Sequence, residues 1–218
     1  YRGAPALGAN WWSVFADGEL DALEAAALKA NQDLGAAFAR VGQAKALSDA
    51  ANAGFWPALS LDPAVARSRT SATAGAASRT QTNYSIPLEL SYEVDIWGRV
   101  RRLSESADAS VRLSAAEFAV VLQTVEADVA QNYFNLRGLD TQAAMLEKSL
   151  ALYRQQEELV GKQAKAGLVP PTDLLQAKTQ VEATTGQLNE VRRQRANVEH
   201  ALAVLTGRAP SELSIPAR

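Results

Sequence analysis

The sequence contains no cysteine and only one histidine, His200. The absence of cysteine excludes disulfide bonds, thiolate metal sites and cysteine-dependent catalysis. There is also no glycine-rich phosphate-binding loop, and a single histidine gives no constellation for a metal or acid–base site. We therefore expect a protein that is not an enzyme and that has no catalytic residue, metal ligand or cofactor.

Long apolar runs and an excess of one charge are absent as well. No stretch approaches the roughly 18 consecutive apolar residues that a membrane-spanning helix needs. The 22 Lys and Arg residues nearly balance the 24 Asp and Glu residues, so the net charge is −2, and the charges are scattered. Nucleic-acid-binding domains carry a basic patch, so we expect no nucleic-acid partner.

The sequence does contain an apolar heptad pattern that continues for many turns. In steps of four and three from Val111 to Ala164, every position is apolar except Asn132 and Glu157. A seven-residue repeat sustained this long is typical of a coiled coil. The predicted helix, residues 99–166, would be roughly 100 Å long at about 1.5 Å per residue. We expect a single elongated unit, since no compact domain of this size has room for such a helix.

A short turn, residues 167–173, separates this helix from a second one. Gly167 suits the left-handed conformation that follows a helix end, and Asp173 with Gln176 resembles a capping box. The returning helix, residues 173–206, repeats the heptad spacing and is predicted to pack antiparallel to the long helix. Residues 17–56 are expected to form two further helices.

The two N-terminal helices have their own start and stop signals. Asp17 is the predicted N-cap of the first helix and Asp33 that of the second, and Pro57 prevents further extension. The second of these helices and the returning helix would stack end to end along the long helix.

Residues 58–97 alternate between apolar and polar side chains and predict a hairpin of two long strands. The alternation is weaker in the first half, and residues 71–82 are expected to form an exposed loop. In the second half, one face carries only apolar residues: Tyr84, Ile86, Leu88, Leu90, Tyr92, Val94 and Ile96. The other face is polar and includes three acidic residues: Glu89, Glu93 and Asp95.

This pattern has two interpretations. An apolar outer face with aromatic residues near its ends is typical of a transmembrane β-barrel strand. An amphipathic strand that covers a soluble core fits the same alternation. In the membrane interpretation other strands must complete the barrel, because open sheet edges are not tolerated in lipid.

Several segments resemble one known family. "LSYEVDIWGRVRR" (residues 90–102), "AGLVPPTDLLQAKTQ" (166–180) and "ALAVLTGRAP" (201–210) are similar to recurrent segments of TolC-like outer-membrane efflux channels. The resemblance is to the lipoprotein branch that serves resistance-nodulation-division pumps. It covers nearly the whole chain, and the order of the motifs makes it specific.

The resemblance implies a fold and an assembly. The fold class would be mainly α, with long antiparallel coiled-coil-like helices and one inserted β-hairpin, the first of two repeats of a channel protomer. Residues 207–218 would begin the segment between the repeats, and a lipid-carrying cysteine would precede residue 1. The intact protein would be a homotrimer in the Gram-negative outer membrane, with a periplasmic extension, lipid contacts and a lipid anchor.

The resemblance also assigns roles to residues. Asp173 corresponds to an aspartate at the closed periplasmic end, with helix capping as the simpler alternative. Gly167, Leu168 and Val169 would contact the periplasmic adaptor protein, or would serve only the turn. Glu89, Glu93 and Asp95 would line the pore, or would be solvated strand residues. Gly98 would make the turn from strand to helix.

The function that these expectations favour is a passive conduit for drugs, solvents or metal ions in a tripartite efflux system, with an adaptor and an inner-membrane pump as partners. A type I secretion channel, a periplasmic adaptor and a soluble coiled-coil scaffold are the alternatives. A periplasmic adaptor attaches its helices to lipoyl-like and barrel domains, whereas here the helices flank a single hairpin with a lipid-compatible face. A coiled-coil scaffold leaves the Tyr84–Ile96 alternation without a purpose.

Overall fold

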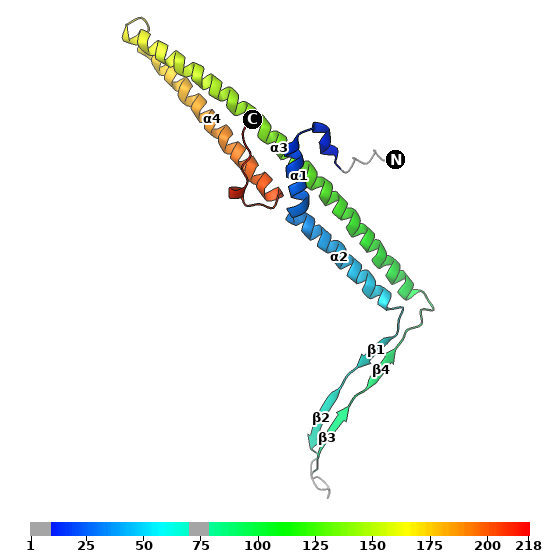
Figure 1. Ribbon diagram of the computed structural model, residues 1–218. Helices are drawn as coiled ribbons and strands as arrows, with labels where there is room; N and C mark the ends of the chain where they lie inside the picture. The colour runs from blue at the N-terminus through cyan, green and yellow to red at the C-terminus, as the bar shows by residue number, and fades with distance from the viewer. Residues whose placement is uncertain (1–9, 70–78) are drawn as a thin grey trace. The chain divides into compact units, whose positions relative to one another are not determined.

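The computed structural model describes residues 10–69 and 79–218 of the chain. Helices and one hairpin make up this part of the chain (Figure 1). The helices are α1 (Gly18–Ala30), α2 (Gln32–Ala53), α3 (Arg99–Lys165) and α4 (Pro171–Leu205), with short 3-10 helices η1 (Trp11–Phe15) and η3 (Pro210–Glu212). The strands are β1 (Ala58–Leu61), β2 (Ala64–Arg69), β3 (Thr80–Ser85) and β4 (Leu88–Ser91). The mainly α fold class with one inserted hairpin is confirmed.

The chain divides into two compact units. The first consists of residues 1–38 and 117–218, and the second of residues 39–116. The sequence predicts one unit instead. Helices that pack side by side contact mainly their immediate neighbours, so the buried side chains do not form one core for the whole chain.

In the first unit, η1, α1 and the start of α2 pack on α3 and α4. The core is built from buried side chains of all these elements: Trp12, Leu20, Leu23, Ala27, Leu34, Val125, Val129, Ala130, Tyr133, Leu136, Leu202 and Ile215. Asp17 is the N-cap of α1, as predicted, because its side chain accepts a 3.0 Å hydrogen bond from the amide of Glu19.

The helices α3 and α4 lie antiparallel and are joined by a short turn (Figure 1). The heptad row faces the partner helix, as the sequence predicts. Leu150 of that row packs with Val181 and Leu188 of α4. Gly167 has φ +73°, and the amides of Gly167 and Leu168 donate to the carbonyls of Ala164 and Gln163. This Schellman motif ends α3 at Lys165.

The predicted capping roles of two aspartates are wrong. The helix α2 begins at Gln32, and the side chain of Asn31, rather than of Asp33, accepts the amides of Asp33 and Leu34 (2.9 and 3.1 Å). The helix α4 begins at Pro171, so Asp173 lies in its first turn and is not its N-cap. Proline has a fixed φ and no amide hydrogen, so it suits this first position, and the helix begins two residues earlier than expected.

In the second unit, the rest of α2 runs antiparallel to the first part of α3. Ser48 donates to Asp108 and Ser104 donates to Asn52, each at 2.5 Å. Ala44 and Ser48 of α2 are buried in this unit.

The hairpin consists of two short ladders in place of two long strands. β1 pairs with β4 and β2 with β3, both antiparallel and in one continuous register. The ladders are interrupted where Asp62 and Pro63 lie opposite Ile86 and Pro87. A proline has no amide hydrogen to donate, and here each strand contains one, at neighbouring pair positions. The expected loop also ends earlier, since β3 starts at Thr80, and residues 70–78 lie outside the described residues.

None of the helices formed by residues 10–69 and 79–218 is long and apolar enough to cross a membrane.

Candidate functional site

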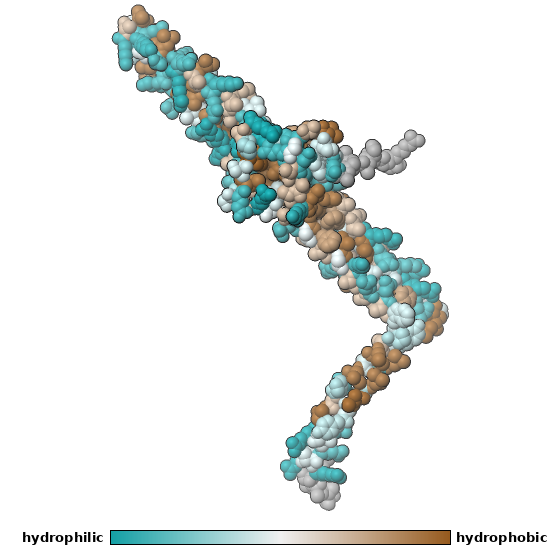
Figure 2. All heavy atoms as spheres, viewed as in Figure 1, coloured by the Kyte–Doolittle hydropathy of each residue, from teal (hydrophilic) through white to brown (hydrophobic). Residues whose placement is uncertain are grey.

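The hairpin carries an apolar face to which both strands contribute. Leu59 lies opposite Leu90, Leu61 opposite Leu88, and Val65 opposite Tyr84. Directly paired residues point to the same side of a sheet, so these six side chains share one face. All six are at least 59% exposed. Figure 2 shows this apolar surface over β1 and β4. The first strand therefore contributes as much to the face as the second, which its weaker alternation did not predict.

The seven residues predicted for the apolar face are all exposed, with fractions from 55% to 74%. Only Tyr84, Leu88 and Leu90 lie within strands, and Ile86 lies in the interruption between the ladders. Tyr92, Val94 and Ile96 follow β4, outside the paired region. The two tyrosines Tyr84 and Tyr92 are eight positions apart, about 27 Å at about 3.4 Å per residue. In a barrel strand tilted by roughly 40° this span would correspond to a height of about 21 Å, which fits within the roughly 25 Å apolar band of outer-membrane barrels.

The three acidic residues of the other face have different surroundings. Glu89 lies in β4 opposite Ser60. Glu93 forms an ion pair with Arg99 at the start of α3. Asp95 accepts the amides of Val100 and Arg101 at 3.1 and 3.0 Å. The structure therefore places one of the three in the paired strand and two at the start of the helix.

The junction between hairpin and helix depends on Gly98. Its φ is +77°, a conformation that residues with a Cβ rarely adopt. The bend at Gly98 places Asp95 beside the first amides of α3. The Asp95 carboxylate accepts hydrogen bonds from two of them and so acts as the capping side chain of this helix. Gly98 thus lies between the end of the hairpin region and the first residue of α3.

The turn between α3 and α4 presents Leu168, which is 75% exposed. Val169 and Asp173 are half-buried. Beside the turn, the two helices form a groove that basic and acidic side chains line: Arg154, Lys162, Lys165, Lys178, Glu157 and Glu158. This end of the pair therefore offers an apolar tip flanked by charge.

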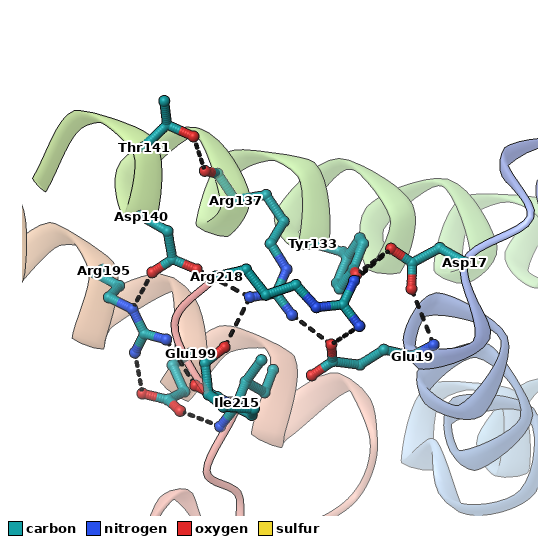
Figure 3. Close-up of polar contacts among 11 residues, drawn as sticks. Asp17, Glu19, Tyr133, Arg137, Asp140, Thr141, Arg195, Glu199, Ile215 and Arg218 are labelled. Atoms are coloured by element: carbon teal, nitrogen blue, oxygen red, sulfur yellow. Dashed lines mark hydrogen bonds and ion pairs between the residues drawn. The ribbon is translucent and has the colours of Figure 1, made fainter. Parts of the chain in front are cut away.

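A buried ion-pair network joins α3, α4 and the segment after α4 (Figure 3). Asp140 accepts from Arg195 at 2.5 Å and from Arg137 at 2.9 Å, and its side chain is 1% exposed. Arg195 also donates to the carbonyl oxygen of Ile215 at 2.6 Å, while the amide of Ile215 donates to Glu199 at 2.6 Å. The network fixes the course of the chain that leaves α4.

The same network continues to α1. Arg137 pairs with Glu19 and donates to the carbonyl oxygen of Pro216. Tyr133 donates its hydroxyl to Asp17 at 2.6 Å, and this hydrogen bond lowers the pKa of the Asp17 carboxyl. Sequence reasoning missed the network, because its members come from four separate segments and none repeats a recognisable spacing.

A second buried feature is a pair of glutamates between α1 and α3. Glu24 is 0% exposed and neither of its carboxyl oxygens has a hydrogen-bond partner. Burial, with smaller contributions from Glu126 and Asp21, raises the pKa of Glu24 to about 8. Glu126 accepts from the indole of Trp11 at 3.3 Å, and burial raises its pKa too. Glu24 lies four residues after Leu20 and three before Ala27, on the buried face of α1. This helical spacing is the sequence signal that could have indicated its burial.

Among residues 10–69 and 79–218, no group of three or more His, Cys, Asp or Glu side chains is arranged to hold a metal ion. The distinctive surfaces of the described chain are thus the hairpin face and the helix turn.

Residues 23–208 match the family model described as outer membrane efflux protein. Two curated relatives come from Pseudomonas putida, each 30% identical to the chain. They are the pyoverdine export outer membrane protein OpmQ, over 91% of this chain and 44% of its own length, and the toluene efflux pump outer membrane protein TtgF, over 94% and 44%.

A similar solved structure is the CmeC outer membrane channel of Campylobacter jejuni. It is 26% identical with a TM-score of 0.83, over 91% of this chain and 43% of that one. The chain thus spans less than half the length of each of these proteins.

Proposed function

Because the chain belongs to the outer membrane efflux protein family, we propose that it forms part of the outer-membrane channel of a tripartite efflux system. The observation that carries the proposal is the hairpin face. An exposed apolar band between Tyr84 and Tyr92, flanked by helices whose heptad rows are buried, has no use in a soluble coiled-coil scaffold. The named relatives are export, efflux and channel proteins, which supports a conduit and gives no support to an enzyme.

Within the proposal, the apolar hairpin face contacts the lipid of the outer membrane, and Gly98 redirects the chain into α3 on the periplasmic side. Two strands cannot close a barrel, which takes at least about eight. Further strands come from other copies and other segments, in a homotrimer with a lipid anchor. The proposed cargo is a class of compounds, drugs, solvents or metal ions, and the relatives are named for pyoverdine export and for toluene efflux.

The turn between α3 and α4 is the proposed contact with the periplasmic adaptor protein, and through it with the inner-membrane pump. Leu168 supports this role, since an apolar side chain that is 75% exposed at a helix-pair tip offers a small docking knob. Gly167 adopts the positive φ that the turn requires, and Val169 is half-buried beside Leu168. Asp173, in the first turn of α4, is the proposed gate residue.

The lipid-facing role can be tested on the chain itself, because a protein without cysteine accepts single-cysteine labels without background. Cysteines at Leu59, Leu88 and Leu90 report the apolar face, and cysteines at Ser60 and Glu89 report the polar face. Each is labelled with an environment-sensitive fluorophore and mixed with phosphatidylcholine vesicles. We expect an apolar emission shift only for the first three positions. Equal shifts on both faces, or none, would contradict the proposal.

A further inference from the structure

The hairpin is charged unequally along its length. Residues 63–88 contain no aspartate or glutamate and three arginines, Arg67, Arg69 and Arg79. The acidic residues of the hairpin region lie at the end that adjoins the helices: Asp62, Glu89, Glu93 and Asp95. The end formed by β2 and β3 is therefore basic in a chain whose net charge is −2.

The register decides on which face the basic side chains of β2 lie. Arg67 and Arg69 lie two and four positions after Val65 in the same strand, so they share the face of Val65 and Tyr84. Their direct partners are Thr82 and Thr80, whose hydroxyls lie on that face too. A one-residue shift would have placed both arginines on the opposite face. Figure 2 shows the apolar surface giving way to polar side chains toward this end of the hairpin.

The distance from the apolar band matches the depth of a headgroup layer. Arg67 lies two residues beyond Val65, about 7 Å along the strand, and Arg69 lies about 13 Å beyond it. A barrel strand tilted by roughly 40° reduces these heights to about 5 and 10 Å. The polar layer of a bilayer begins at the edge of the hydrocarbon and is about 5–8 Å thick on each side, so the backbone of Arg67 lies within it. The backbone of Arg69 lies just outside it, within reach of the layer for a long arginine side chain.

Resting on the proposed function, we infer that this basic end of the hairpin binds anionic phosphate headgroups of the membrane leaflet that it reaches. A guanidinium group matches phosphate with two parallel hydrogen bonds, and the exposed Arg67 and Arg69 have threonine hydroxyls beside them as further donors. The apolar face and the basic end together set the depth of the hairpin in the bilayer.

The test measures partition of the 218-residue chain by vesicle flotation. The vesicles contain either phosphatidylcholine alone or phosphatidylcholine with about 25 mol% phosphatidylglycerol. An arginine near an anionic surface contributes about fivefold in affinity, so we expect at least a tenfold gain with phosphatidylglycerol, reduced by high salt. A chain of net charge −2 without this local site would show no gain.

Two triple variants with the same loss of charge locate the effect. Arg67→Gln, Arg69→Gln and Arg79→Gln together should abolish most of the gain and leave binding to phosphatidylcholine unchanged. The control, Arg40→Gln, Arg112→Gln and Arg154→Gln, removes exposed arginines of the helices and should keep the gain. Equal losses in the two variants would overturn the inference.

The remaining outcomes separate the possible causes of failure. Binding to phosphatidylcholine without any gain from phosphatidylglycerol overturns this inference and leaves the lipid-facing hairpin intact. No binding to either vesicle contradicts the proposed function as well. Sodium phosphate that releases the chain more strongly than sodium sulfate of equal ionic strength indicates a site for free phosphate and overturns the headgroup assignment.

Discussion

The side chain of Asn31 donates a 3.0 Å hydrogen bond to the carbonyl oxygen of Leu205, the last residue of α4. Its Oδ1 atom meanwhile caps the start of α2. One amide side chain thus satisfies an unpaired carbonyl at one helix end and unpaired amides at another. Gly207 permits this approach, since a Cβ at its φ of +67° would collide with the carbonyl of Ala30. The junction thus joins the first residues of α2 to the end of α4.

Changes at Asn31 should separate its two functions. Asn31→Asp keeps the cap of α2 but replaces the donor to Leu205, so we expect a loss of about 1 kcal/mol in the free energy of unfolding. Asn31→Ala removes both contacts and should cost about 2–3 kcal/mol. Urea denaturation followed by circular dichroism measures both. Asn189→Ala, at an exposed position of α4, is the control and should change stability by less than about 0.5 kcal/mol.

The buried Glu24 predicts that stability falls as pH rises. Its pKa in the folded chain, about 8, exceeds the ordinary value of 4.5, so between these values the folded state keeps a proton that the unfolded state releases. The free energy of unfolding should therefore decrease by about 1–3 kcal/mol from pH 5 to pH 8. Glu24→Gln, which cannot ionise, should flatten this dependence.

The control for this prediction is Glu182→Gln, at an exposed site of α4. Denaturation curves at several pH values give the slope for each protein. If Glu24→Gln leaves the slope unchanged, or if Glu182→Gln flattens it as much, the pH dependence does not come from a protonated Glu24.

Two arginines of α4 that are three residues apart should differ in importance. Arg195 pairs with the buried Asp140, whereas Arg192 pairs with Glu147 at the surface, where both side chains are more than half exposed. Arg195→Met removes one of the two arginines that donate to the buried Asp140 carboxylate and leaves the carbonyl of Ile215 without its donor, so it should cost about 2–4 kcal/mol. Arg192→Met should cost less than about 1 kcal/mol. Thermal unfolding of both variants provides the comparison, and similar losses would show that the network contributes little.

Asp173 allows a comparison of the capping and gating roles. It lies in the first turn of α4 without capping it, so Asp173→Ala and Asp173→Asn should lose the same small amount, about 0.3–1 kcal/mol, from the helix dipole. If Asp173 capped α4, Asp173→Asn would lose less stability than Asp173→Ala, because asparagine caps a helix about as well as aspartate does. In the assembled trimer, both variants should raise the resting conductance in planar bilayers. Unchanged conductance would remove Asp173 from the proposed gate.

The sequence by itself determined the elements that depend on local repetition. The heptad row from Val111 to Ala164 specified a long helix within α3 (Arg99–Lys165), because a seven-residue apolar period selects one helix face wherever it occurs. Gly98 and Gly167 indicated the two turns, since both positions need a positive φ that glycine adopts without strain. The alternation around Leu88 and Leu90 identified the apolar face of the hairpin, because successive side chains of a strand point to opposite faces.

Only the tertiary structure decided what depends on distant partners. The capping role passed from Asp33 to Asn31 because the end of α4, 174 residues away, supplies a second partner for the asparagine. Asp140 became part of a buried network only because Arg195 and Ile215 meet it in space. The face of Arg67 followed from its pairing with Thr82. A periodic pattern fixes the direction of a side chain relative to its own element, whereas hydrogen bonds and burial depend on which other element lies there.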